Sequence, residues 1–216
     1  MRLLVTGTDT DVGKTRVTAR VAATLRAAGR APTIVKLVQT GVSNDAPGDA
    51  QWAGSAAGCA YSESARFQRA TDPWSAALAE DKPPPTVAGL CASLPARPRS
   101  VVAEGSGGLA VPLNAHETFV DFARAARLDV IVTVGLRLGC INHALLTLLA
   151  CSQAGVSVVG AVLVDRWNLR DPEYHRDVVR ILGGKTRIVD ELSYNAVDPP
   201  IDERSTYRLR SMLELN

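Results

Sequence analysis

The stretch Gly7-Thr8-Asp9-Thr10-Asp11-Val12-Gly13-Lys14-Thr15 follows a short apolar run and leads into residues 16–28, which contain good helix formers and no proline. A strand, a glycine-bounded loop and a Gly-Lys-Thr that opens a helix together predict a phosphate-binding loop. The N–H groups and the dipole at the start of that helix attract an anion. Lys14 would reach the terminal phosphates, and the Thr15 hydroxyl would bind magnesium. This context disfavours the alternative of an ordinary loop that contains Gly-Lys-Thr.

One feature of this loop is its length. In the general pattern the first glycine stands six residues before the lysine, but that position is Thr8 here and the glycine is Gly7. The longer spacing is typical of a narrower group of phosphate-binding loops.

The composition sets limits on the class of protein. A chain of 216 residues that is 46% hydrophobic and 21% charged can bury one substantial core, so we expect a single domain. Its formal charge of +2 gives no basic field for nucleic acid, and no apolar stretch approaches the roughly 20 residues that span a membrane. We expect no signal peptide, because the N-terminus already reads as a strand. The cysteines have no Cys-x-x-Cys spacing, which predicts a reduced, cytoplasmic protein without a zinc site.

The order of apolar segments predicts an α/β fold, a mostly parallel sheet covered by helices on both faces. Strands are expected at residues 2–6, 33–38, 100–103, 129–134, 156–164 and, more weakly, 186–189. Helices are expected at residues 14–28, 49–57, 86–94, 120–126, 141–154 and 173–182, with a last short one at 206–213. Residues 41–48 read as a mobile loop and residues 81–85 as a stiff connection. Ligands of such sheets bind beyond the carboxyl ends of the strands.

A lysine ends the second predicted strand, in Lys36-Leu37-Val38-Gln39-Thr40-Gly41. A lysine in an apolar strand is costly unless it is paired or lies at a wet strand end. Lys36 would place a second positive charge beside the phosphates; the alternative is a side chain that extends to solvent. Its place one strand away from the loop favours the first interpretation.

A carboxylate follows the third predicted strand, in Glu104-Gly105-Ser106-Gly107-Gly108. Glu104 would hold magnesium directly or through water, and the glycines allow the backbone to approach a ligand closely. The alternative is a turn with an exposed glutamate. Asp49 is a second candidate metal ligand, and Asp45 competes with it.

The fourth strand leads into Gly139-Cys140-Ile141-Asn142-His143 and an apolar helix. That helix is apolar almost all round, so we expect it to be buried against another subunit as well as the sheet. Its N-terminus, with the Asn142 side chain nearby, suits a carboxylate. We expect His143 to pack or hydrogen-bond there, and His116 and His175 to be surface residues without a metal.

These motifs together are similar to the dethiobiotin synthetase family, over residues 2–164. The loop at 7–15 and the turn at 139–143 carry the resemblance, and residues 36–41 and 104–108 support it in the expected order. The resemblance implies one domain over residues 1–216 that is a ligase of biotin biosynthesis. In this family 7,8-diaminononanoate takes up CO2 as a carbamate, ATP phosphorylates the carbamate, and the second amine closes a cyclic urea.

The resemblance also implies roles for residues. The catalytic residues would be Lys36, Lys14 and Thr10, which lie around the migrating phosphoryl group. The nucleotide would contact Asp11, Val12, Gly13, Lys14, Thr15, Arg16, Glu104 and Gly107. The diamine would contact Thr10, Lys36, Thr40, Gly139, Cys140 and Asn142, and magnesium would be held by Thr15, Asp49 and Glu104. The substrate tail would reach a second subunit, so we expect a homodimer.

Some residues depart from the family pattern. Leu37 replaces the usual proline, Ser106 the usual alanine, and Asp11 a frequent glutamate. Many relatives have an adenine-reading asparagine at the position of Val164, and residues 188–192 lack an expected proline. Apolar contacts discriminate between ligands by only about 10 to 200-fold, so we expect relaxed choice among nucleoside triphosphates.

Three other functions compete with this one. A partitioning or positioning ATPase usually has a lysine where this chain has Thr10, which argues against that class. A glutamine-dependent amide synthetase would need a glutaminase domain for which the chain has no room. A degenerate nucleotide-binding relative is disfavoured by the presence of Lys14, Thr15, Lys36 and Glu104.

Overall fold

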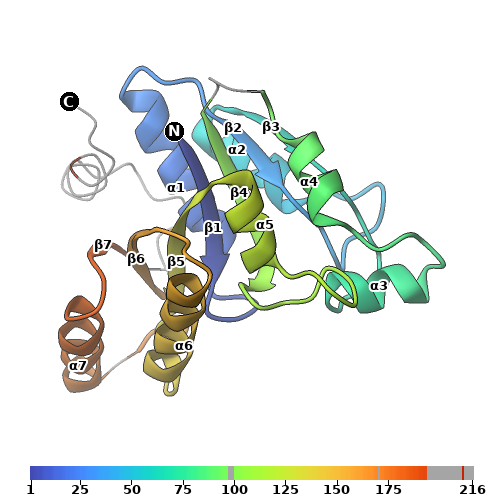
Figure 1. The fold of residues 1–216 in the computed structure, drawn as a ribbon. Helices are drawn as coiled ribbons and strands as arrows, with labels where there is room; N and C mark the ends of the chain where they lie inside the picture. The colour runs from blue at the N-terminus through green and yellow to red at the C-terminus, as the bar shows by residue number, and fades with distance from the viewer. Residues whose placement is uncertain (97–99, 170, 194–210, 212–216) are drawn as a thin grey trace.

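The computed structural model describes residues 1–96, 100–169, 171–193 and 211. Within these residues, seven parallel strands form one sheet in the order β3-β2-β4-β1-β5-β6-β7 (Figure 1). The strands are β1 (Arg2–Gly7), β2 (Thr33–Lys36), β3 (Ala60–Glu63), β4 (Val101–Gly108), β5 (Asp129–Gly135), β6 (Val158–Asp165) and β7 (Ile188–Ser193). The helices are α1 (Lys14–Ala27), α2 (Asp49–Ala57), α3 (Pro73–Ala79), α4 (Val87–Ser93), α5 (Phe119–Ala126), α6 (Cys140–Gln153) and α7 (Pro172–Gly183).

Two hydrophobic cores lie on opposite faces of the sheet. Side chains of successive strand residues point to opposite faces, so Leu3 packs under α1 and α2 whereas Leu4 packs under the other helices. The α3 to α7 side has the larger core, which includes Phe119 and Phe122 of α5. The predicted α/β fold with helices on both faces is therefore confirmed.

The structure adds two elements and corrects several boundaries. β3 and α3 were absent from the sequence prediction, and β4 runs on to Gly108 although the prediction ended it at residue 103. Gly7 and Gly108 are paired across β1 and β4, so two glycines that the prediction placed outside the strands lie inside the sheet. The helix expected at residues 206–213 lies, apart from residue 211, outside the described residues.

A buried ion pair joins α1 to the edge of the sheet. Arg20 Nε of α1 lies 3.2 Å from Asp190 Oδ2 of β7, and both side chains are almost completely buried. No described helix is long and apolar enough to cross a membrane.

Candidate active site

The phosphate-binding loop joins the end of β1 to the start of α1. It contains two residues with left-handed backbone, Asp11 (φ 59°) and Gly13 (φ 95°). A Cβ added at Gly13 would lie 2.9 Å from Val164 Cγ1, so both the positive φ and the close packing on β6 require glycine there. Lys14 Nζ donates a hydrogen bond of 2.9 Å to the carbonyl oxygen of Asp9 and lies within the loop.

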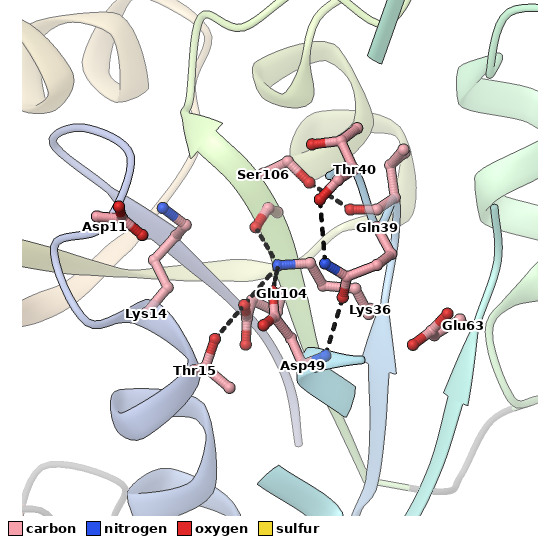
Figure 2. Close-up of polar contacts among 12 residues, drawn as sticks. Asp11, Lys14, Thr15, Lys36, Gln39, Thr40, Asp49, Glu63, Glu104 and Ser106 are labelled. Atoms are coloured by element: carbon pink, nitrogen blue, oxygen red, sulfur yellow. Dashed lines mark hydrogen bonds and ion pairs between the residues drawn. The ribbon is translucent and has the colours of Figure 1, made fainter. Parts of the chain in front are cut away.

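Lys36, at the carboxyl end of β2, lies at the centre of a polar cluster that includes Glu104 of β4 (Figure 2). The sheet register pairs Lys36 directly with Glu104, which places the two side chains beside each other. Lys36 Nζ lies 2.6 Å from Glu104 Oε1 and 2.6 Å from Asp49 Oδ2. Thr15 Oγ1 donates a hydrogen bond of 3.0 Å to the same Glu104 oxygen. The cluster thus joins the start of α1, the start of α2 and two strands.

Burial and charge shift the pKa values of the two lysines in opposite directions. Burial, assisted by the positive charge of Lys36, lowers the pKa of Lys14 from 10.5 to about 8. Burial also acts to lower the pKa of Lys36, but the Glu104 and Asp49 carboxylates outweigh it and raise that pKa above 10.5. Lys36 is therefore a permanent cation at neutral pH, whereas Lys14 titrates near the upper end of the physiological range.

Gln39 is a positioning residue that the sequence analysis did not single out. Its Oε1 accepts a hydrogen bond of 2.9 Å from the backbone N–H of Asp49, the first residue of α2. This contact fixes the start of α2 beside Lys36 (Figure 2). Of the two candidate aspartates, the structure brings Asp49 to the cluster, whereas Asp45 is exposed on the loop before α2.

A pocket of about 860 Å³ opens above this cluster. It contains most of the residues that the sequence suggested for catalysis, nucleotide and metal: Thr10, Asp11, Gly13, Lys14, Thr15, Arg16, Lys36, Thr40, Asp49, Glu104 and Gly107. Val12 is instead buried beneath the loop, so any contact with a nucleotide would come from its backbone. Glu104, within β4, is buried and lines the pocket, which contradicts the alternative of a turn with an exposed glutamate.

The turn at residues 139–142 lies outside this pocket. Gly139 has φ 93° and precedes α6, and Asn142 is exposed in the first turn of that helix. The Cys140 side chain is buried at 3.5 Å from the Tyr174 hydroxyl, and its N–H bonds the carbonyl of Arg137. A single chain therefore does not bring the proposed tail-binding residues to Lys36.

In a single chain α6 is buried on one side, and the expected contact of its other side with another subunit stays a prediction. Within α6, all of whose residues are described, the buried residues are Cys140, Ala144 and Cys151. Leu146 and Leu149 are 56% and 52% exposed, because α6 contacts β5 of the sheet and α7 with one side and no described element packs on the other.

The oxygen atoms of the cluster fit magnesium. Two carboxylates, Glu104 and Asp49, and the Thr15 hydroxyl converge from three elements, and hard oxygen ligands are those that magnesium prefers. In the structure a cation, the Lys36 ammonium, already bridges both carboxylates. The described residues contain no group of three or more His, Cys, Asp or Glu side chains that would form a metal site without such a hydroxyl.

Two arginines hold the phosphate-binding loop and were not predicted. Arg137, after β5, forms an ion pair with Asp9 and lies over the Trp167 ring at 5.5 Å. Arg166, after β6, contacts Asp11. Both follow the carboxyl ends of strands, which is the one signal that the sequence offers for them.

Comparison with known proteins identifies the family. The model of a family described as an AAA domain matches residues 1–196. ATP-dependent dethiobiotin synthetases of Anaeromyxobacter sp. (strain K) and Rhodococcus jostii (strain RHA1) are each 39% identical to the chain. The first match covers 74% of this chain and 75% of the relative, and the second covers 78% and 79%. The chain belongs to the dethiobiotin synthetase family.

This confirms the resemblance that the four motifs predicted. Another dethiobiotin synthetase, from Yersinia pestis bv. Antiqua (strain Angola), is 34% identical over 84% of this chain and 80% of its own length. Among solved structures, the cell division ATPase MinD of Pyrococcus furiosus has a TM-score of 0.60 at 16% identity and covers 99% of this chain and 98% of its own. That likeness shows the fold alone and does not favour a positioning ATPase over a dethiobiotin synthetase.

Proposed function

We propose that this protein, over residues 1–216, is an ATP- and magnesium-dependent dethiobiotin synthetase of biotin biosynthesis. It would join 7,8-diaminononanoate and CO2 into the cyclic urea dethiobiotin, and ATP would be converted to ADP and phosphate. The observation that carries the proposal is the meeting of Lys14 and Lys36 in one pocket with Glu104 and Asp49. The dethiobiotin synthetase relatives support it.

The chemistry needs charge stabilisation more than acid–base catalysis. An amine of the substrate takes up CO2 and loses a proton to give a carbamate, whose oxygen then accepts the terminal phosphoryl group of ATP. The second amine attacks the carbamoyl carbon, and phosphate leaves as the ring closes. Lys14, at the start of α1, and Lys36, at the end of β2, would stabilise the charge that spreads over the migrating phosphoryl oxygens.

The remaining pocket residues would orient the reactants. The loop backbone from Asp11 to Thr15 would bind the nucleotide phosphates through its N–H groups. The hydroxyls of Thr10 and Thr40 would lie near the carbamate and the reacting amines. Magnesium, held by Thr15, Asp49 and Glu104, would neutralise phosphate charge.

We propose a homodimer in which α6 forms part of the contact. Leu146 and Leu149 leave an apolar face open, and Leu138 before the helix is 88% exposed. A second copy of the chain would cover this face and bring the partner's tail-binding turn toward the pocket, where Gly139 and Asn142 would meet the substrate carboxylate. Sedimentation of the natural chain and of Leu146→Asp tests this. A charge on a face that is buried in the dimer should prevent dimerisation and leave a folded monomer.

We place the protein in the cytoplasm, with small molecules and not nucleic acid as its partners. The four cysteines, all among the described residues, are free thiols, which supports a reducing compartment. The formal charge of +2 supports the absence of nucleic-acid binding.

The alternative is a partitioning or positioning ATPase. The side chain at the pocket-lining position 10 is a threonine and not the lysine usual in that class, so the alternative is not favoured. Purified protein should be incubated with 7,8-diaminononanoate, bicarbonate, Mg²⁺ and ATP, and the urea product sought by mass. Nucleotide hydrolysis without that product would contradict the proposal.

A further inference from the structure

The loop after β6 contacts the phosphate-binding loop through Arg166. Its Nη1 donates a hydrogen bond of 2.7 Å to the carbonyl oxygen of Asp11 and lies 3.3 Å from Asp11 Oδ1. Arg166 also lines the same pocket as Lys14 and Thr15. Two segments separated by 155 residues are thus joined at the apex of the loop. None of the motifs that carry the family resemblance contains this arginine.

The contact with the carbonyl fixes the direction of a peptide unit. In a planar trans peptide the C=O and the following N–H point in opposite directions. Arg166 holds the Asp11 carbonyl and therefore also sets the direction of the Val12 N–H. Asp11 and Gly13 both have left-handed backbone, and successive N–H groups in such turns form concave anion sites. The orientation of this peptide unit is therefore part of what makes the loop able to bind phosphate.

The second contact concerns charge. The Asp11 side chain is 75% exposed and lines a pocket that must receive a polyanion. An unpaired carboxylate there would repel the phosphates. The Arg166 guanidinium lies beside the Asp11 carboxylate and offsets its charge.

We infer that Arg166 is a positioning residue for the polyphosphate chain, acting through the backbone and the carboxylate of Asp11. It orients the backbone of the phosphate-binding loop so that the loop binds phosphate, and it does not recognise the nucleotide base. The inference rests on the nucleotide-binding part of the proposed function and is independent of the diamine substrate.

The test measures binding, not turnover. Dissociation constants are measured by calorimetry in Mg²⁺ buffer at pH 7.5 for ATP, GTP, CTP and inorganic tripolyphosphate. Arg166→Ala should weaken all four by a common factor of about 10, because a charge-assisted hydrogen bond on the loop is lost in each case. Arg166→Lys keeps a cationic donor and should recover at least half of that loss on a logarithmic scale.

The matched control is Arg176→Ala. Arg176 lies on α7, is exposed, and pairs with Glu173 at 3.7 Å outside the pocket. Its removal should leave all four affinities within 2-fold. The melting temperature of each variant is measured alongside, and the lysine variant provides a folded protein should the alanine variant be unstable.

Two results would overturn the inference. One is an Arg166→Ala protein that binds every probe within 2-fold of the natural chain. The other is a loss for the nucleotides without a loss for tripolyphosphate, which would place Arg166 on the base or ribose. A natural chain that binds none of the four probes would instead contradict the proposed function itself.

Discussion

Replacing Lys36 by methionine removes the ammonium group and keeps most of the buried apolar stem. In the natural chain this ammonium lies 2.6 Å from Glu104 Oε1, and both side chains are almost fully buried. At an effective dielectric constant of about 20 the attraction is about 6 kcal/mol, and desolvation of the two ions offsets part of it. Removing one partner of a buried pair costs about 3–5 kcal/mol, because the other charge stays buried.

The contact with Asp49 adds little to this figure. The Asp49 side chain is 37% exposed, so water screens its attraction to Lys36. For a chain of this size each kcal/mol lowers the melting temperature by about 2–4 °C, so Lys36→Met should melt roughly 10 °C below the natural chain. Lys82→Met, which removes an exposed lysine paired with Glu80, is the control and should change the melting temperature by no more than about 2 °C.

Lys36→Met should also change the effect of Mg²⁺ on the melting temperature and the turnover of the enzyme. Without the ammonium, Glu104 and Asp49 face each other with the Thr15 hydroxyl, so Mg²⁺ without nucleotide should raise the melting temperature of Lys36→Met more than that of the natural chain. Turnover should fall by about 10² to 10³-fold, as for other removed donors that act on transition-state charge, with a smaller change in KM. An unchanged melting temperature together with unchanged turnover would refute the reasoning.

The remaining predictions concern pH, the base and the substrate tail. Since the pKa of Lys14 is lowered to about 8, ATP affinity should fall as the pH rises from 8 to 9.5, and calorimetry at pH 8.5 should detect proton uptake on binding; a flat profile would contradict this. For the same group the folded pKa lies below the unfolded value, so the free protein should gain stability between pH 8 and 10.5 in thermal unfolding. With Val164 buried against Gly13, turnover with ATP, GTP and CTP at equal concentration should agree within about 10-fold, and strict ATP selectivity would be the contrary result. Asn142→Ala should raise KM for the diamine with kcat kept, since a tail contact binds ground state and transition state alike; an unchanged KM would remove Asn142 from the tail site.

Much of the site could be predicted because parallel strands bring their carboxyl ends together. Residues 7–15, Lys36 and Glu104 each follow or end an apolar run, and the register of the sheet then places them side by side. The choice of Asp49 over Asp45 depended on the Gln39 side chain, a contact that composition and periodicity do not encode.

Other elements gave weaker or misleading signals. β3 is a four-residue edge strand with mostly exposed side chains, so it has no apolar run. α3 has a start signal, Asp72 as N-cap followed by Pro73, but its seven residues are too few for a clear helical period. The arginine contacts with Asp9 and Asp11 join residues more than a hundred positions apart, and only the tertiary structure brings them together.

The Arg20–Asp190 contact has a consequence for how the sheet is completed. An edge strand held by apolar contacts alone could slip by two residues or detach at modest cost. Here a shift of β7 would separate a guanidinium in the interior from its carboxylate, a cost that grows with burial. The ion pair therefore fixes the register of β7 against β6. A chain that ends before Ile188 should fail to fold, and not merely lack one strand of the sheet.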